Sequence, residues 1–537
     1  MSPRVARGRP AAPGLARGPL HRMAVAAATR VPSGDPSREA ADLLAAIRAS
    51  AAALAAMGEA ADGEGAEILG FQQALLEDDE LSRPAFEAIA AGASADAAFA
   101  QALDAEIAGY QASEDDYFRA RAADLQDLRD RVLMTLAGGP AAEEAPAGAI
   151  LAGADMAPSR FLATDWTAGG GIALSAGSPS SHVAMLARSR GVPMVVGLGD
   201  ALAEAEGVVL LDGGAGELVV GPDAAASAAF AAKQAREAAF AREAAALLDK
   251  PARTRDGTLI LVHLNVADPA ELKSLDPAHC DGIGLVRTEF LFHDRASLPG
   301  EEAQFGVYRT IAEWAAGRPV TIRTLDAGAD KPIPGLTPEG ESNPFLGMRG
   351  LRLSLARPDV LRVQLRALLR ASAYGAVKIM LPMVTNIAEV AAARAMLEEE
   401  RAALLAQGRK LGEPPLGIMV EVPAAAIAVD LFDVAFYSIG SNDLVQYVTA
   451  AGRDIGAVAD LADPLHPAVL RLVGQVAAFG RASGRDVSLC GDAGGDPAVL
   501  PHLVRAGLRS VSVSPAALAR AKATIAGLDL SAAEAAA

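Results

Sequence analysis

The second half of the chain repeats one pattern eight times, in which a short apolar run is followed by an interval long enough for a helix. The runs are nearly continuous in Val, Ile and Leu, and such runs indicate parallel strands buried on both faces. Eight strands alternating with helices over about 270 residues are typical of a (β/α)8 barrel, which we predict over residues 253–530. The strands are expected at residues 259–266, 282–287, 320–326, 377–384, 416–422, 434–440, 487–491 and 510–514.

Three further segments precede the barrel. Residues 37–137 carry apolar residues at helical spacing and predict an all-helical subdomain. Residues 138–222 are richer in Gly and Pro and contain short β runs around one helix at about 181–190, which predicts a small α/β domain. Residues 223–252 are rich in Ala, Glu and Arg and predict a helical linker. The chain is therefore expected to be a multidomain α/β protein with a C-terminal barrel.

The first 36 residues have an unusual composition. They contain six arginines before the first acidic residue, Asp35. A transit peptide has this composition, and so does a disordered tail or a start assigned too early, since Met23 offers a second start. Of these we favour a disordered or wrongly assigned N-terminal tail over residues 1–36.

Charge and cysteine content exclude several classes of protein. The formal net charge of −18 argues against a general nucleic-acid binder and against attachment to anionic lipid, because both need a basic surface. The longest stretches without charge contain Gly, Ser and Pro, so we expect no membrane insertion. Two cysteines in 537 residues rule out a disulfide framework and fit a reducing cytosol.

Polar side chains follow several of the predicted strands. Because active sites of barrels lie at the carboxyl ends of the strands, we expect these side chains to converge on one rim. Arginine presents a rigid fork to phosphate or carboxylate, and carboxylates hold Mg²⁺ while the substrate provides further oxygens. One polar residue at a strand end is ordinary, but the set predicts a site for a small polyanion and a divalent metal. Its members are Arg287, Arg323, Asp326, Glu421, Asn442, Asp443 and Cys490.

His182 is a second candidate residue. Small residues precede it, and an amphipathic helix is expected to start at or just before it. The free N–H groups and partial positive charge of a helix N-terminus favour a phosphoryl group. A histidine at a helix start is more often a cap or a surface residue, so this signal alone does not identify a nucleophile.

Five segments match a known set of motifs. They are GSPSSHVAMLAR at 177–188, GLVRTEF at 284–290, NPFLG at 343–347, SIGSNDL at 438–444 and CGD at 490–492. The first resembles the phosphohistidine signature of phosphoenolpyruvate-utilising enzymes, and the others resemble motifs of their phosphoenolpyruvate-binding barrel. In order, spacing and length, the chain from about residue 38 to 525 resembles the Enzyme I family of bacterial phosphotransferase systems.

The resemblance implies a role for each candidate residue. His182 would carry the phosphoryl group, and Cys490 would protonate the enolate as it becomes pyruvate. Mg²⁺ would be bound by Glu421 and Asp443. Phosphoenolpyruvate would be held by Arg287, Arg323, Arg349, Asn442, Asp443 and Arg453.

The resemblance also implies partners and motion. Residues 37–137 would dock an HPr-like phosphocarrier, the protein acceptor of the first step of a sugar phosphorelay. Such enzymes are cytosolic homodimers joined through the barrel. Because His182 and the barrel belong to different domains, residues 138–222 would form a swivelling phosphohistidine domain with a hinge in the linker.

A few positions depart from the family pattern without removing a reacting group. They are Ser178, Ser180, Ala329, Gly452 and Asp492. The Gly-rich β segment that usually opens the family has no clear counterpart in residues 1–37. The phosphohistidine domain is therefore expected to lack one or two strands.

Two other functions are compatible with parts of this pattern. A dikinase-type relative would share the histidine and the barrel, but it needs an ATP-binding domain for which no Gly-rich nucleotide loop is visible before residue 138. A catalytically impaired regulatory homologue would bind phosphoenolpyruvate or the carrier without turnover. The substitutions and the shortened start favour that homologue, whereas the retained reacting groups count against it.

Overall fold

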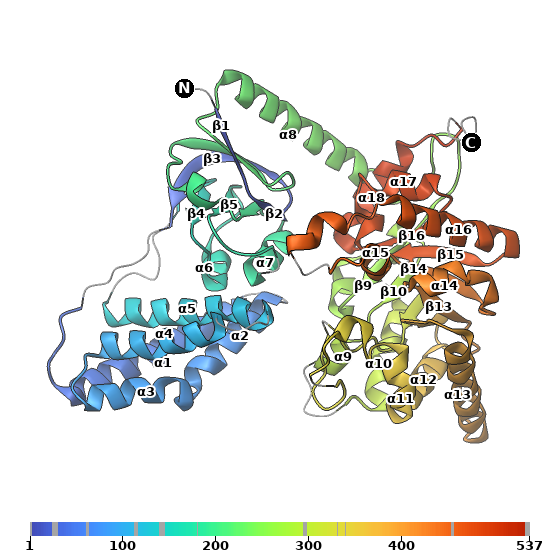
Figure 1. Ribbon diagram of the computed structural model, residues 1–537, viewed down its shortest axis with the longest axis horizontal. Coiled ribbons are helices and arrows are strands. Elements are labelled where there is room, and N and C mark those ends of the chain that lie inside the picture. The colour runs from blue at the N-terminus through green and yellow to red at the C-terminus, as the bar shows by residue number, and fades with distance from the viewer. Residues whose placement is uncertain are drawn as a thin grey trace. The chain divides into compact units, whose positions relative to one another are not determined.

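The computed structural model describes residues 3–23, 30–60, 64–111, 116–138, 145–179, 181–293, 298–329, 331–338, 340–452 and 456–531. The chain forms two compact units, Met1–Arg236 and Glu237–Ala537 (Figure 1).

The first unit contains a bundle of five helices. They are α1 (Pro36–Ala60), α2 (Glu64–Glu77), α3 (Asp79–Ala90), α4 (Ala95–Gln111) and α5 (Asp116–Leu136). The helices bury leucines and alanines at helical spacing, among them Leu43, Leu54, Leu103 and Leu128. By length and composition Pro36–Glu59 could cross a membrane, but a core helix passes the same test, and the inner face of α1 packs within the bundle.

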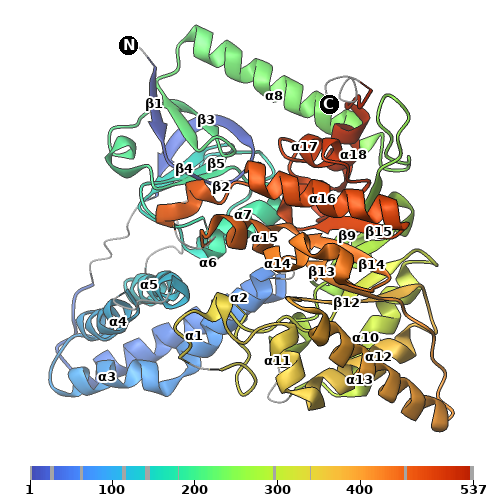
Figure 2. The same ribbon diagram turned by 45° about the vertical axis from the view of Figure 1, so that its right-hand side comes forward.

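The rest of the first unit is built on an eight-stranded sheet in the order β1-β8-β7-β3-β4-β5-β6-β2. Neighbours β3 to β6 pair in parallel, and the other pairs are antiparallel. Helices α6 (Pro158–Ala163) and α7 (His182–Arg190) lie between this sheet and the helical bundle (Figures 1 and 2). The strands are β1 (Arg4–Arg7), β2 (Arg9–Ala12), β3 (Leu15–Arg22), β4 (Ile150–Gly153), β5 (Gly171–Leu174), β6 (Met194–Val196), β7 (Val208–Asp212) and β8 (Glu217–Val220).

The prediction of an N-terminal tail over residues 1–36 is wrong for residues 4–22, which supply β1, β2 and β3. The expected loss of strands from the phosphohistidine domain is wrong for the same reason. These strands escape pattern analysis because they bury alanine and glycine and expose arginine, as in the Ala16 and Gly18 positions of β3. A Cβ on Gly18 would lie 2.1 Å from the carbonyl oxygen of Gly148, so close approach of the backbones requires a small residue here. Residues 24–29 lie outside the described part of the chain.

Helix α8 (Ala224–Ala245) follows β8 and crosses the boundary between the units. The second unit is a closed barrel of eight parallel strands in the order β10-β11-β12-β13-β14-β15-β16-β9, which confirms the predicted barrel. Every predicted run contains one strand or overlaps it. The strands are β9 (Leu261–Val266), β10 (Ile283–Val286), β11 (Val320–Arg323), β12 (Val377–Leu381), β13 (Leu416–Val420), β14 (Phe436–Gly440), β15 (Asp486–Cys490) and β16 (Ser510–Val513).

Helices surround the barrel (Figure 2). The α-helices are α9 (Phe290–His293), α10 (Glu301–Trp314), α11 (Leu351–Ala356), α12 (Pro358–Ala371), α13 (Ile387–Ala406), α14 (Pro423–Ile427), α15 (Ser441–Thr449), α16 (Pro467–Ser483), α17 (Leu500–Arg505) and α18 (Leu518–Ala526). Strand residues that face outward join the main apolar core with these helices. A smaller cluster is made by Leu285, Met380, Met419, Phe436 and Cys490, so the thiol of Cys490 has an apolar surrounding.

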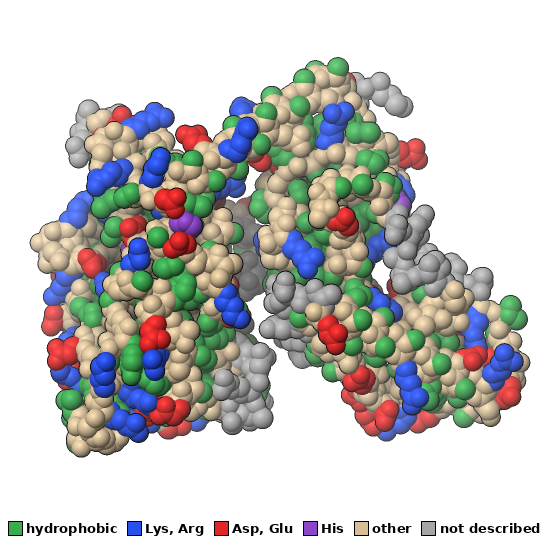
Figure 3. Space-filling view, turned by 180° about the vertical axis from the view of Figure 1, so that it is seen from behind, with side chains coloured by type: hydrophobic (Ala, Val, Ile, Leu, Met, Phe, Trp, Pro, Cys, Tyr) green, Lys and Arg blue, Asp and Glu red, His purple; other side chains and the backbone are tan. Residues whose placement is uncertain are grey.

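The surface carries charges of both signs. Figure 3 shows acidic and basic side chains interspersed on the face that it presents, without a broad basic area.

Candidate active site

A cavity of about 330 Å³ opens at the carboxyl ends of the barrel strands. Its walls come from the ends of β10, β11, β13, β14 and β15 and from the first turn of α15. Six of the predicted site residues line it. They are Arg287, Arg323, Glu421, Asn442, Asp443 and Cys490.

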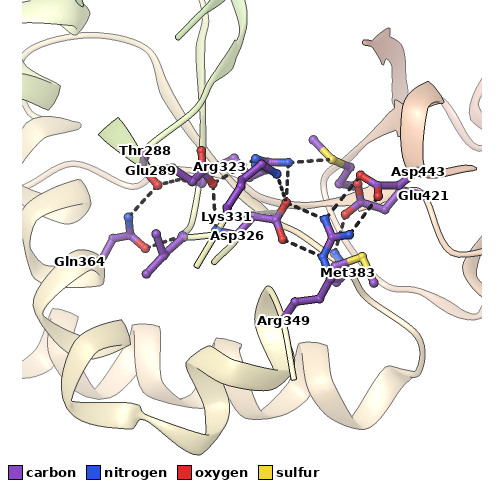
Figure 4. Close-up of polar contacts among 12 residues, drawn as sticks. Thr288, Glu289, Arg323, Asp326, Lys331, Arg349, Gln364, Met383, Glu421 and Asp443 are labelled. Carbon is purple, nitrogen blue, oxygen red and sulfur yellow. Dashed lines mark hydrogen bonds and ion pairs between the residues drawn. The ribbon is translucent and has the colours of Figure 1, made fainter. Parts of the chain in front are cut away.

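Asp326 is the centre of a buried charge network beside this cavity (Figure 4). Its Oδ2 lies 3.1 Å from Arg323 Nη1, 3.1 Å from Lys331 Nζ and 3.0 Å from Arg349 Nη2. Burial acts to raise the pKa of Asp326, but the three cations outweigh it and hold the pKa below its ordinary value. Arg323 also pairs with Glu289, whose Oε1 accepts a hydrogen bond from Arg323 Nη2 at 3.0 Å. Arg323 is thereby fixed in one orientation at the cavity wall.

Arg349 was predicted to bind substrate, but it does not line the cavity. Its side chain is fully buried, with Nη1 3.0 Å from Asp443 Oδ1 and Nη2 on Asp326. Nη1 also donates to the hydroxyl of Tyr447 at 3.2 Å. Both Asp326 and Asp443 pair with this guanidinium, so Arg349 holds the two carboxylates in position beside the cavity.

Glu421 and Asp443 form the acidic side of the cavity. Glu421 is fully buried, and burial, followed by the negative charges of Asp443 and Asp326, raises the pKa of Glu421 to about 7. Its Oε1 accepts from the backbone N–H of Met383 at 2.6 Å, and Met383 has a left-handed φ of 56°. A Cβ on Gly440 would lie 2.8 Å from Glu421 Oε2, so a larger residue would displace the carboxylate.

These two carboxylates fit a divalent cation. The negative charges of Asp443 and Asp326 help to raise the pKa of Glu421, and a bound cation would offset this repulsion. Carboxylate oxygens are also the ligands that Mg²⁺ prefers. Within the described residues no set of three His, Cys, Asp or Glu side chains is placed to hold a metal. The remaining oxygens would therefore have to come from substrate and water.

Cys490 and Asn442 complete the wall. Burial raises the pKa of the Cys490 thiol, and the Ser438 hydroxyl donates to its sulfur at 3.4 Å. Asn442 is held by Asp492, since its Nδ2 donates to Asp492 Oδ2 at 3.0 Å and its Oδ1 accepts from the Asp492 backbone N–H at 3.1 Å. The aspartate at 492 therefore has a defined task, which is to orient the amide of Asn442.

Two further cations face the cavity, and each has fewer polar partners than Arg323 has. Lys331 contacts Asp326 and remains partly exposed, whereas the guanidinium of Arg287 has no hydrogen-bond or ion-pair partner within the described part of the chain. Arg287 also borders an adjoining cavity of about 400 Å³, with Glu271 and Asp492. The predicted substrate ligand Arg453 lies outside the described residues.

His182 is the first residue of α7, and this helix lies where the sequence predicts one, at about residues 181–190. Ser181 caps the helix, with its hydroxyl accepting from the N–H of Ala184 at 3.3 Å. Arg188 donates to the carbonyl oxygens of Ala11 in β2 at 2.7 Å and Pro179 at 2.8 Å. One side chain thus ties the signature loop and the N-terminal strands to the same helix.

Some residues that contact the predicted site residues were not predicted from the sequence. Lys331 lies eight residues beyond the end of β11, too far to be recognised as a strand-end residue. Met383 acts through its backbone, and Asp124, whose Oδ2 lies 3.4 Å from His182 Nδ1, belongs to a helix far away in sequence. The left-handed backbone of Ala329 (φ 56°) could be anticipated from the sequence, because the family that the chain resembles commonly has glycine at this position.

Comparison with known proteins defines the class. Three family models match in succession: "PEP-utilising enzyme, N-terminal" over residues 7–121, "PEP-utilising enzyme, mobile domain" over 145–216, and "PEP-utilising enzyme, PEP-binding domain" over 241–530. The helical and sheet segments, the His182 helix and the barrel with its cavity are thus the parts of a phosphoenolpyruvate-utilising enzyme.

Relatives narrow the assignment. The phosphoenolpyruvate-protein phosphotransferase of Streptomyces coelicolor is 38% identical over 98% of this chain and 94% of its own length, and that of Bacillus sp. (strain S) is 38% identical over 86% of this chain and 81% of its own. The NMR solution structure of the Enzyme I protein nEIt matches with 24% identity and a TM-score of 0.36, covering 43% of this chain and 99% of that one. The chain belongs to the phosphoenolpyruvate-protein phosphotransferase family.

Proposed function

We propose that this enzyme transfers the phosphoryl group of phosphoenolpyruvate to His182 and from there to an HPr-like phosphocarrier, releasing pyruvate. The observation that carries the proposal is the barrel cavity, in which cations oppose carboxylates and a thiol. Its occupant must present negative charge to Arg287, Arg323 and Lys331 and metal-binding oxygens to Glu421 and Asp443. Phosphoenolpyruvate, with one phosphate and one carboxylate, meets both demands.

The cations prepare the substrate for transfer. The planar fork of Arg287, which no acid neutralises within the described residues, suits a phosphate or carboxylate of the ligand. Arg323 and Lys331 are held by Asp326 and need no reorganisation when the substrate enters. Asn442, fixed by Asp492, offers an amide N–H. Phosphoryl transfer depends mainly on such positioning and charge stabilisation.

A bound Mg²⁺, held by Glu421 and Asp443, would neutralise phosphoryl oxygens and withdraw charge from the bridging oxygen. In its presence the Glu421 carboxylate is expected to ionise, because the cation offsets the burial and the negative charge of Asp443 that raise the pKa of Glu421. Arg349 holds Asp443 in the orientation that this role needs.

Cys490 is the proton donor for the enolate. Its raised pKa keeps the sulfur protonated at neutral pH, which is the state a general acid requires. The apolar cluster around it buries the sulfur, and the Ser438 hydroxyl holds the sulfur in position. Loss of the phosphoryl group leaves an enolate, and a proton delivered to its methylene carbon yields pyruvate.

Labelling tests the proposal. Native chain is incubated with radiolabelled phosphoenolpyruvate and Mg²⁺, beside His182→Ala and the matched control His279→Ala, which removes a histidine on the other unit. We expect acid-labile label on the native chain and on the control, released when an HPr-like protein is added. Label that persists on His182→Ala, or absent from the native chain, contradicts the assignment.

The structure weakens the regulatory alternative. Part of its support was a shortened phosphohistidine domain, and strands β1, β2 and β3 complete that sheet.

We also propose, from the family resemblance, a cytosolic homodimer joined through the barrel. Ile427 and Leu431 are 62% and 64% exposed on the barrel and offer an apolar contact. A native chain that sediments as a dimer, and as a monomer after Leu431→Glu, supports this assembly; a monomeric native chain contradicts it.

A further inference from the structure

A buried carboxylate lies beside the ring of His182. Asp124, on α5 of the helical bundle, is 2% exposed, and its Oδ2 is 3.4 Å from His182 Nδ1. Neither oxygen of Asp124 has a partner at ordinary hydrogen-bond distance and angle within the described residues. The imidazole is therefore the group available to compensate this carboxylate.

The position of Asp124 is fixed by its neighbours. One helical turn further on, Asp127 Oδ1 accepts from the Ser159 hydroxyl of α6 at 2.8 Å, and its Oδ2 accepts from Gln72 Nε2 of α2 at 3.2 Å. Because α6 packs against α7, these bonds hold α5 against the layer that carries His182. The Asp124–His182 pair is thus part of a built interface between the bundle and the sheet domain.

A buried carboxylate without a hydrogen-bond donor is costly, so Asp124 favours a proton on the nitrogen that faces it. A neutral imidazole with its proton on Nδ1 carries its lone pair on Nε2. We propose that Asp124 is a positioning residue that holds the His182 proton on Nδ1, leaves Nε2 to carry the phosphoryl group, and keeps the phosphorylated ring reactive toward the carrier. This inference rests on the proposed function.

The proton matters most when the phosphoryl group leaves. On uptake, the Nε2–P bond forms, the P–O bond of the donor breaks, and the ring keeps its Nδ1 proton and gains one positive charge. On transfer, the Nε2–P bond breaks and its electron pair returns to Nε2, which gives a neutral imidazole. Without the Nδ1 proton the leaving group would be an imidazole anion, a far poorer one. The Asp124 carboxylate stabilises the protonated phosphorylated ring.

The location of Asp124 assigns it to one half-reaction. It belongs to the helical bundle, which is the docking segment for the carrier under the proposed function. Under the predicted swivel of residues 138–222, His182 would leave the bundle to take up the phosphoryl group at the barrel, so Asp124 would face its ring only during delivery. Its loss should therefore slow delivery to the carrier more than uptake from phosphoenolpyruvate.

Rapid-quench kinetics of the full chain test this assignment, with Asp124→Asn compared to Asp130→Asn, an exposed acid on the same helix that pairs with Arg129. We expect Asp124→Asn to slow delivery about ten- to a hundredfold, as loss of the charged partner of the Nδ1 proton implies, and to slow uptake less. Asp130→Asn should leave the ratio of the two rates unchanged. Equal slowing of both steps by Asp124→Asn, unchanged delivery, or the same selective loss in Asp130→Asn overturns the proposal.

A second measurement separates this inference from the proposed function. Nitrogen-15 spectra of histidine-labelled full chain, with His182 assigned by its loss in His182→Ala, report which ring nitrogen carries the proton. We expect Nδ1–H in the native chain and in Asp130→Asn, and a shift toward Nε2–H in Asp124→Asn. A native chain that takes up no label refutes the proposed function, whereas an unchanged ring in Asp124→Asn refutes the role of Asp124.

Discussion

Removal of the Arg349 guanidinium should destabilise the barrel strongly. Arg349 is fully buried between Asp326 and Asp443, 3.0 Å from each. In Arg349→Met, Asp326 keeps Arg323 and Lys331, but Asp443 loses its only ion pair within the described residues and still faces Glu421.

The size of the effect follows from this distribution of charge. Breaking a buried ion pair by removing one partner typically costs about 3–5 kcal/mol. Because Asp326 remains compensated, we expect the lower end, about 3 kcal/mol of unfolding free energy, or more than a hundredfold in the folding equilibrium. The double variant Arg349→Met/Asp443→Asn should lose less than the sum of the single losses, because the amide that replaces the Asp443 carboxylate leaves no unpaired charge in the interior.

Tryptophan fluorescence during urea unfolding measures this effect. The chain has two tryptophans, Trp314 in α10 of the barrel and Trp166 in the first unit, so Trp166→Phe leaves a reporter of the barrel alone. The control is Arg357→Met, since Arg357 is partly exposed and pairs with the exposed Asp359. We expect the control to stay within about 0.5 kcal/mol. An Arg349→Met barrel as stable as the control would refute the assignment of Arg349 as the support of the two carboxylates.

Three further outcomes are expected. Hydrogen bonds from Arg30, from Ser33 and from the Ala95 N–H lower the pKa of Glu39 from 4.5 to about 2, so its stabilisation is complete above about pH 4.5 and is lost as the pH falls through 2. Circular-dichroism melts should thus show Glu39→Gln destabilised at pH 7 by up to about 3 kcal/mol and equal to the native chain near pH 2; a pH-independent difference argues against the pairing. Cys490→Ser should slow pyruvate formation by at least about a hundredfold while His182 labelling slows less, and equal slowing in a quench-flow experiment would exclude its role as proton donor. Gly18→Ala should lower the melting temperature of the first unit, because its Cβ would clash with a carbonyl oxygen at 2.1 Å, whereas Gly109→Ala in α4 has open space and should not.

The barrel was predictable because its strands are buried on both faces. Their Val, Ile and Leu runs leave a signal that few surface residues interrupt. Arg287 and Glu421 directly follow β10 and β13, and Cys490 is the last residue of β15. Residues at consecutive strand ends must meet at one rim, so topology alone brings the cations and acids of the cavity together.

The N-terminal strands and the supports of the site were not predictable in this way. β3 buries Ala16 and Gly18 because the neighbouring backbone lies too close for larger side chains, and small residues give no hydrophobic period. The place of Arg349 depends on which of several acids it meets, and motif resemblance cannot distinguish a ligand of the substrate from a ligand of the carboxylates. Asp124 meets His182 only through the packing of α5 against α6 and α7.

The measurement that tests the account most directly is the location of the phosphoryl group. Native chain is incubated with phosphoenolpyruvate and Mg²⁺, digested under alkaline conditions that preserve phosphohistidine, and mapped by mass spectrometry. We predict one phosphoryl group per chain, on the peptide that contains His182, and its disappearance when an HPr-like protein is added. A phosphoryl group on any other residue, or an unmodified His182 peptide under conditions in which pyruvate is released, would contradict the account.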